Sequence, residues 1–192
     1  MASFDQPTHP ESGISAWIAR FAPLIPAGGQ ILDVAAGRGR HTRWLLDRGY
    51  RVTAVDIDAT GLRDLADKTN CQVVEADMEQ GPWPFGPASF DAIIVTNYLH
   101  RPHFPHLVAS LATNGLLLME CFGQGNERYG RPRNPDFLLQ AGELLQAFGK
   151  QLQIIAYECG FESHPRPAMR QRLCAARSEA QPWQLDQFPA PD

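Results

Sequence analysis

The sequence predicts an α/β fold in which helices cover both faces of a mostly parallel sheet. Strand-like segments alternate with helix-like segments between residues 30 and 122, which is the pattern of βαβ units. The strand-like segments are nearly unbroken apolar runs, as in parallel strands buried on both faces. The chain of 192 residues is long enough to bury a three-layer core as a single domain.

The elements follow one another in a regular order. Residues 12–25 carry apolar side chains at helical spacing and predict a leading helix, which the following prolines and glycines end. Five strands are predicted at residues 30–36, 51–57, 71–77, 90–99 and 115–122. Helices are predicted at residues 41–50, 60–69 and 103–113. This order is typical of a parallel sheet.

The C-terminal part departs from this alternation. Residues 123–137 are a polar loop rich in Gly, Pro and Arg, residues 142–148 predict a helix, and residues 152–162 and 169–178 predict two strands. The connection between these strands is too short for a crossover helix, so we expect an antiparallel hairpin. We expect residues 1–192 to form one domain whose ends, residues 1–11 and about 181–192, are loosely ordered.

Composition narrows the possible partners. The formal net charge is −4, whereas nucleic-acid and membrane binders need an excess of Lys and Arg. We therefore expect no nucleic acid and no membrane as partners, and a cytoplasmic location because no targeting pattern is visible. The four cysteines lie far apart without metal-ligand spacing, so we expect buried thiols and no bound metal. No pattern indicates an oligomeric state.

A glycine-containing turn follows the first predicted strand. In residues 31–42, Asp33 stands near the strand end and Gly37-Arg38-Gly39 leads into a helix. A dinucleotide site would need a third glycine where Thr42 stands, and Asp33 would repel a pyrophosphate. A carboxylate at this place instead attracts a cationic group such as an α-ammonium. The turn favours a cationic, phosphate-free, nucleotide-like ligand.

Acidic residues also mark the ends of the next two predicted strands, Asp56 and Asp77. The carboxyl ends of adjacent parallel strands form the ligand crevice of an open sheet. There Asp56 can accept hydrogen bonds from ribose hydroxyls and Asp77 from an exocyclic amine, while Ile57 and Met78 offer apolar surface to an adenine ring. Any one aspartate also fits a turn or a helix cap. Their occurrence at three successive strand ends favours a ligand site.

Residues 28–122 resemble class I S-adenosylmethionine-dependent methyltransferases of the small-molecule and tellurite-resistance-like branch. The resemblance rests on Asp-x-Ala-x-Gly-x-Gly, then Asp, then Asp-Met, then FDAIIVTNYLH. It implies a Rossmann-like three-layer sandwich whose seven-stranded sheet has six parallel strands and one antiparallel strand. It also implies S-adenosyl-L-methionine as cofactor, S-adenosyl-L-homocysteine as product, and a floor of Asn97 and Tyr98 beneath the sulfonium. The implied cofactor-binding residues are Asp33, Ala35, Gly37, Gly39, Arg40, Asp56, Ile57, Asp77, Met78, Asn97 and Tyr98. Ala35 stands where many members have glycine.

The acceptor site is expected beside the ends of the fourth and fifth strands. Tyr98 and His100 are candidates for catalysis, the latter as a general base, and Glu120 is a candidate for contact with the acceptor. His103 and His106 are expected to face solvent. The loop at 123–137 adds the substrate candidates Arg128, Tyr129, Arg131 and Arg133. We expect this loop to be a lid whose arginines bind an anion, the alternative being a solvated loop with its arginines paired to Glu127, Asp136 and Glu143.

The sequence thus predicts a methyltransferase acting on a small-molecule acceptor, either anionic or a soft nucleophile such as a thiol or a selenium or tellurium oxyanion. Residues 97–100 lack the Asn/Asp-Pro-Pro-Tyr pattern of base-amine methylation, and Cys121 lies in a strand, away from where cytosine-C5 methylation needs its nucleophile. Two other classes stay open. They are an NAD-type oxidoreductase and a non-catalytic, methyltransferase-like binding module.

Overall fold

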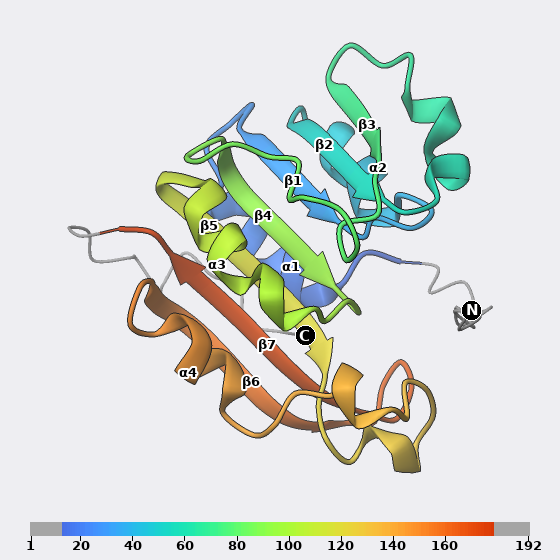
Figure 1. The fold of residues 1–192 in the computed structure, drawn as a ribbon, viewed down its shortest axis with the longest axis vertical. Helices are drawn as coiled ribbons and strands as arrows, with labels where there is room; N and C mark the ends of the chain where they lie inside the picture. Colours follow the sequence, from blue (N-terminus) through green and yellow to red (C-terminus); the bar gives the residue numbers. More distant parts are fainter. Residues whose placement is uncertain (1–12, 179–192) are drawn as a thin grey trace.

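The computed structural model describes residues 13–178, in which a seven-stranded sheet has the order β3-β2-β1-β4-β5-β7-β6 (Figure 1). The strands are β1 (Gln30–Val34), β2 (Arg51–Asp56), β3 (Cys71–Glu75), β4 (Phe90–Thr96), β5 (Leu111–Phe122), β6 (Gln153–Glu162) and β7 (Ala168–Ala176). The first five pair in parallel, and β7 runs antiparallel to both β5 and β6. Six strands therefore point one way, and the predicted sheet and C-terminal hairpin are confirmed. The expected loose ends at 1–11 and 181–192 lie outside the described residues.

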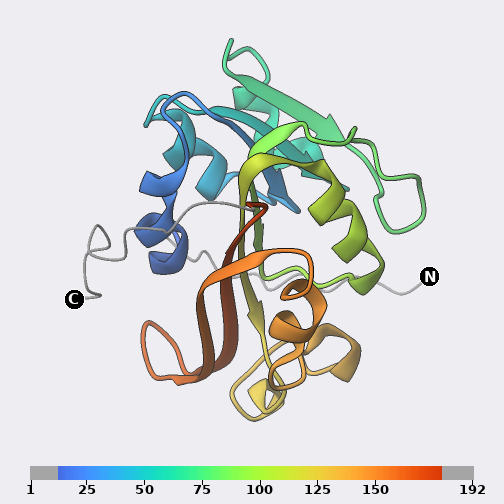
Figure 2. The ribbon, with the colours of Figure 1, turned by 90° about the vertical axis from the view of Figure 1, so that its left-hand side faces the viewer.

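Helices cover both faces of the sheet (Figure 2). One face carries α1 (Ala16–Phe21), η1 (Ala22–Leu24), α2 (Arg40–Leu46) and η2 (Ala59–Leu65), whose apolar residues form one buried cluster with side chains such as Ile31 and Ile94. The other face carries α3 (Phe104–Ser110) and α4 (Glu143–Phe148), which form a second cluster with Leu32 and Ile93. Neighbouring strand residues enter opposite clusters because side chains alternate along a strand.

The leading helix is short and is fixed over the C-terminal strands. The Ser15 hydroxyl accepts the Ile18 N–H and caps α1, satisfying one of the free donors of its first turn. Trp17 and Phe21 pack edge to face with ring centroids 4.6 Å apart, and the Trp17 indole N–H donates to the Leu173 carbonyl at 3.2 Å. These contacts bring the N-terminal segment next to β7.

Several predicted elements differ in type or extent. Residues 60–69 were expected to form an α-helix, but Ala59–Leu65 is a 3-10 helix, in which Gly61 approaches so closely that a Cβ would lie 3.1 Å from Arg38 Cα. Strand β4 ends at Thr96 because Asn97 adopts a left-handed φ of 57°. The helix predicted at 103–113 ends at Ser110, and its last residues begin β5.

The expectation of four buried thiols is wrong for two cysteines. Cys121 and Cys174 are buried, Cys71 is half-buried and Cys159 is exposed. Cys159 lies on β6, the edge strand of the sheet, and an edge strand is covered less completely than a central one. Among the helices of residues 13–178, none combines the length and the apolar character needed to cross a membrane.

Candidate active site

Asp33 is a buried carboxylate with one unsatisfied oxygen. It lies in β1, and the residue is 1% exposed. Oδ2 accepts the Thr42 hydroxyl at 2.6 Å, whereas the buried Oδ1 has no hydrogen-bond partner among residues 13–178. Burial raises the pKa of Asp33 to about 6, because water no longer solvates the charged form. A cationic donor would satisfy both the charge and the second oxygen.

The turn after β1 depends on left-handed backbone conformations. Ala35, Gly37 and Gly39 have φ angles of 54°, 57° and 73°, which glycine adopts without steric cost. Ala35, which stands where many members of the resembled family have glycine, therefore adopts a backbone conformation that favours glycine. At position 39 close packing adds a second requirement, since a Cβ there would lie 2.6 Å from Leu62 Cδ2. The backbone of this turn is thereby held close to the sheet edge.

Asp56 ties the same turn to the end of β2. Its Oδ2 accepts the Gly37 N–H at 2.7 Å and its Oδ1 accepts the Asp58 N–H at 3.1 Å. Each carboxylate oxygen has two lone pairs, so both oxygens keep the capacity to accept a ligand hydroxyl. Ile57 follows with 56% of its surface exposed. The Asp56 carboxylate thus holds the turn in place and can also accept hydrogen bonds from the two hydroxyls of a diol.

At the end of β3, the structure shows the turn-capping role that the sequence left open. Asp77 is exposed, and its Oδ1 accepts the N–H groups of Glu79 and Gln80, both at 3.0 Å. Met78 is buried beside it. A contact of Asp77 with adenine stays a prediction.

The two predicted floor residues lie in different environments. The backbone N–H of Asn97 donates to the Glu120 carbonyl at 2.8 Å, and its side-chain Oδ1 accepts from Arg170 Nη1 on β7. Tyr98 instead packs against the cluster on the α3 face, and its buried hydroxyl has no hydrogen-bond partner within the described part of the chain. Burial raises the pKa of that hydroxyl above its usual value. Asn97 is therefore linked to the hairpin strands, and Tyr98 to α3.

Glu120, a candidate for contact with the acceptor, is bound by two other side chains. Its carboxylate accepts Arg172 Nε at 2.7 Å and the Ser15 hydroxyl at 3.0 Å, and the residue is 6% exposed. The β-sheet register sets Thr96 beside Glu120, and Glu120 beside Arg172. Thr96, Glu120 and Arg172 therefore form a polar row across the sheet beneath α1. The Glu120 carboxylate is already hydrogen-bonded to Arg172 and Ser15.

His41 borders this polar row. Its Nε2 accepts the Ser15 backbone N–H at 3.3 Å, and its Nδ1 lies 3.4 Å from the Thr96 hydroxyl. Burial lowers the pKa of His41 to about 3, so the imidazole is neutral at physiological pH.

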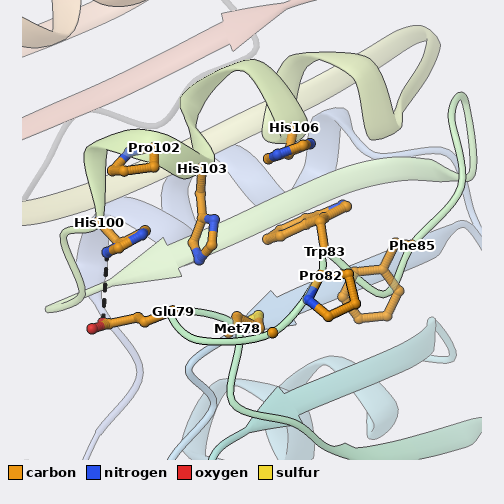
Figure 3. Close-up of a pocket in the computed structure, with 10 residues that line it drawn as sticks. Met78, Glu79, Pro82, Trp83, Phe85, His100, Pro102, His103 and His106 are labelled. Carbon is orange, nitrogen blue, oxygen red and sulfur yellow. Dashed lines mark ion pairs between the residues drawn. The ribbon is translucent and has the colours of Figure 1, made fainter.

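His100 lines a cavity of about 470 Å³ on the α3 face (Figure 3). Its Nδ1 lies 3.9 Å from Glu79 Oε1. Trp83 forms part of the wall and stacks on His106, with centroids 5.8 Å apart and planes 10° from parallel. His103 was expected to face solvent but is 5% exposed, because its ring lies among His100, Trp83 and Tyr98. Burial, with His100 and His106 nearby, lowers the pKa of His103 to about 4.

The arginine-containing loop is fixed at its base and exposed at its surface. Asn126 is buried, accepting the Met169 N–H at 3.2 Å and donating to the Pro132 carbonyl at 3.3 Å. Tyr129 packs on Phe161 of the hairpin at 4.9 Å. Arg128, Arg131 and Arg133 are exposed. Glu143, one of the carboxylates proposed to pair with them, is bound by Arg101.

The sequence did not reveal four residues that support the site through contacts with its predicted members or with their neighbours. Thr42, His41, Arg170 and Arg172 all contact predicted site residues or their neighbours. Thr42 and His41 follow the glycine turn directly in the sequence, and this closeness was a signal that could have made them site candidates. The two arginines come from β7, where an alternating strand pattern gives no indication of which partner each side chain meets.

Comparisons with known proteins relate part of the chain to a protein family and its fold to solved structures. Residues 31–114 match the family described as a methyltransferase domain. No curated protein matches the chain. The chain is similar in structure to TehB from Haemophilus influenzae (TM-score 0.70, 17% identity), covering 85% of this chain and 62% of that one. The domain match agrees with the methyltransferase class that the sequence predicts.

Two further solved structures share the fold. An S-adenosylmethionine-dependent methyltransferase from Mesorhizobium loti has a TM-score of 0.70 and 20% identity, with 86% of this chain and 99% of that chain covered. The 1,6-didemethyltoxoflavin-N1-methyltransferase of Burkholderia thailandensis, solved with its acceptor and S-adenosylhomocysteine, has a TM-score of 0.63 and 19% identity over 84% of this chain and 76% of that one. These similarities confirm the predicted Rossmann-like fold.

Proposed function

We propose that this chain, whose residues 31–114 match a methyltransferase domain, binds S-adenosylmethionine at the ends of β1, β2, β3 and β4 and methylates a small-molecule acceptor. The observation that carries this proposal is the buried Asp33 carboxylate, whose Oδ1 has no hydrogen-bond partner among residues 13–178. The α-ammonium of the cofactor supplies both the positive charge and the donors that this carboxylate needs. A nicotinamide dinucleotide would instead bring a pyrophosphate close to a carboxylate, which electrostatics disfavours.

The remaining cofactor residues follow from the same placement. Gly37, Gly39, Ala35 and Arg40 border the methionine end, and Asp56 accepts the ribose hydroxyls. Asp77 accepts from the exocyclic amine of adenine, with Ile57 and Met78 against the ring faces. The exposed Ile57 supports this, because an apolar side chain left in water gains from covering by an aromatic ring. Asn97 and Tyr98 form the floor beneath the sulfonium.

The chemistry requires alignment more than acid–base catalysis. When bound, the cofactor supplies an electrophilic methyl group on a sulfonium. The protein must hold the acceptor in line with that methyl group and exclude water. The acceptor is proposed to be anionic or a soft nucleophile, with the exposed arginines of residues 123–137 as its binding groups. The structurally similar 1,6-didemethyltoxoflavin-N1-methyltransferase, whose acceptor is a small molecule, supports a small-molecule acceptor. We further propose that the protein is cytoplasmic and has no nucleic-acid or membrane partner.

Calorimetric titration tests the cofactor assignment. S-adenosylhomocysteine and S-adenosylmethionine should bind, and NAD should not. Binding of NAD alone would reassign the chain to the oxidoreductases. If S-adenosylhomocysteine binds but no methyl group is transferred to any of a panel of thiols, carboxylates, oxyanions and amines, the chain is a binding module. Methyl transfer to nucleic acid rather than to small molecules would contradict the proposed acceptor class.

A further inference from the structure

We propose that two copies of this chain associate through the outer edges of their β6 strands, which pair antiparallel with Cys159 of one copy opposite Cys159 of the other. The inference goes beyond the proposed function and does not depend on it. The pairing joins the two seven-stranded sheets into one continuous sheet across a two-fold axis, and the interface uses the same surface of both copies.

The outer edge of β6 is open. β6 is the last strand of the sheet (Figure 1). Its inner side pairs with β7, and the structure of residues 13–178 shows no backbone partner on its outer side. With ten residues, β6 is longer than β3, the five-residue strand at the opposite edge of the sheet. A long open edge is a template for a further strand, so β6 is the stronger of the two edges for pairing.

The sequence of β6 lacks the usual features that protect an edge strand. It contains no Lys, Arg or Pro, which natural edge strands use to prevent pairing. Its two charged residues, Glu158 and Glu162, are both bound by arginines of β7. Arg172 contacts both carboxylates, and Arg170 contacts that of Glu162. The negative charge of the edge is thus largely neutralised within each copy, and it opposes pairing only weakly.

The regular part of β6 defines the register of the pairing. The register with β7 shifts between Ile154 and Ala156 and is regular from Ala156 to Glu162. Cys159 is the middle residue of this regular segment. Antiparallel pairing centred on Cys159 therefore aligns the whole segment with its counterpart, whereas any other centre leaves part of it unpaired. A two-fold axis perpendicular to the sheet also requires a centre at a residue, because directly opposed side chains lie on the same face.

The charges of β6 favour the same centre. Pairing centred on Cys159 places Glu158 opposite Gly160 of the second copy, and the space around Gly160 is open. A centre at Glu158 would instead place the two Glu158 carboxylates opposite each other. A centre at Gly160 would place Glu158 opposite Glu162. Like charges that are directly opposed destabilise paired strands, so both neighbouring registers are disfavoured.

The aromatic side chains of β6 agree with this register. Tyr157, Cys159 and Phe161 lie on one face, because side chains alternate along a strand. Phe161 is 54% exposed, and the register places it opposite Tyr157 of the second copy, where an aromatic pair stabilises the contact. Phe161 also packs on Tyr129 of the loop at 123–137, with ring centroids 4.9 Å apart. That loop therefore rests on an aromatic group to which both copies contribute.

The interface is small. Pairing of the regular segments supplies about six to eight backbone hydrogen bonds. Edge pairing of this length buries less than the roughly 1,200 Å² of a stable complex. We therefore expect a weak dimer whose population rises with protein concentration.

The first test measures the mass of the full chain in solution under reducing conditions. Sedimentation equilibrium should show reversible monomer–dimer association in the micromolar range. Cys159→Lys places two ammonium groups opposite each other at the two-fold axis and should weaken association about 10-fold or more, whereas Cys159→Ser should leave it nearly unchanged. Gln153→Lys is the matched control. It adds a lysine at an exposed position of the same strand, outside the regular segment, and should associate like wild type.

The second test measures the register. Mild oxidation of wild type should join two copies through Cys159, because directly opposed residues lie about 4.5–5.5 Å apart, and Cys159→Ser should abolish this cross-link. Phe161→Cys in the Cys159→Ser background offers another exposed thiol. The two copies of position 161 lie about 13 Å apart along the paired strands, beyond the reach of a disulfide. This variant should give little cross-linked dimer, and equal cross-linking at both positions would contradict the register.

Three further outcomes would overturn the proposal. Wild type could remain a monomer at every concentration, or its association could be unaffected by Cys159→Lys, in which case another surface forms the dimer. The third outcome concerns the chain's own residues 179–192, which lie outside the described structure and are the alternative cover for the edge. A full chain that is monomeric and dimerises only after their removal would show that they cover β6. None of these results bears on S-adenosylhomocysteine binding, which calorimetry tests separately.

Discussion

Replacing Asp33 by asparagine should stabilise the ligand-free protein and weaken cofactor binding. Asp33 is 1% exposed, and burial raises the pKa of its carboxyl from 3.8 to about 6. Holding it ionised in the folded protein therefore costs about 3 kcal/mol at neutral pH. Asparagine removes this cost and can still accept the Thr42 hydroxyl, but its NH₂ group leaves a buried donor unpaired at a cost of about 1–2 kcal/mol. The expected net gain is about 1–2 kcal/mol.

The pH dependence identifies the cause of this gain. A carboxyl whose folded pKa is raised binds its proton more tightly in the folded state. The stability of wild type should thus fall as pH rises from about 4 to about 6 and then stay constant with respect to this group. The variant lacks this dependence, so its advantage should be present at pH 7.5 and absent near pH 4.

Urea unfolding at pH 4, 6 and 7.5, with calorimetric titration of S-adenosylhomocysteine at pH 7.5, measures both effects. Affinity should fall about 10- to 100-fold, because a charge-assisted bond to the ammonium is lost. Asp58→Asn serves as a control, since that exposed carboxyl has a lowered pKa from its bond to Thr60 and should give no gain. Unchanged affinity, or a stability gain independent of pH, would refute the reasoning.

Three further predictions concern the site and its loop. Asp56→Asn, which keeps an acceptor for the Gly37 N–H, should weaken S-adenosylhomocysteine binding about 10- to 100-fold by calorimetry; equal affinity would contradict its ribose role. Gly39→Ala should lower the free energy of unfolding by about 2–4 kcal/mol, since its Cβ would lie 2.6 Å from Leu62 Cδ2 at a φ of 73°. The control is Gly37→Ala, whose Cβ would have no atom of residues 13–178 within 4 Å apart from its chain neighbours; urea unfolding should show a smaller loss of free energy for it. Replacing Arg128, Arg131 and Arg133 by Gln should depress acceptor turnover while leaving cofactor affinity unchanged, and hydrogen exchange of residues 123–137 should slow only when an acceptor is also bound; full activity would reduce the loop to a connector.

Much of the fold was predictable because its signals are local. The apolar runs, their spacing and the short connection before the last strand follow from the chain within about fifteen residues of each element. The aspartates near the strand ends were predictable for the same reason, since parallel topology brings the carboxyl ends of the strands to one edge of the sheet. The left-handed conformation of Ala35 agrees with a glycine turn that the sequence already indicated.

Other features were decided only by the tertiary structure. The sequence shows that Glu120 and Arg172 lie on strands, but only the register makes them neighbours. Arg170 and Asn97 are 73 residues apart, and no local pattern links them. His103 is buried because Trp83 and Tyr98 close around it. Local propensity describes a residue's own segment, whereas a residue's partners and burial depend on how distant segments pack. The sequence by itself therefore determined the sheet and brought the aspartates to one edge of it. Packing decided which polar groups of that edge are bound within the protein.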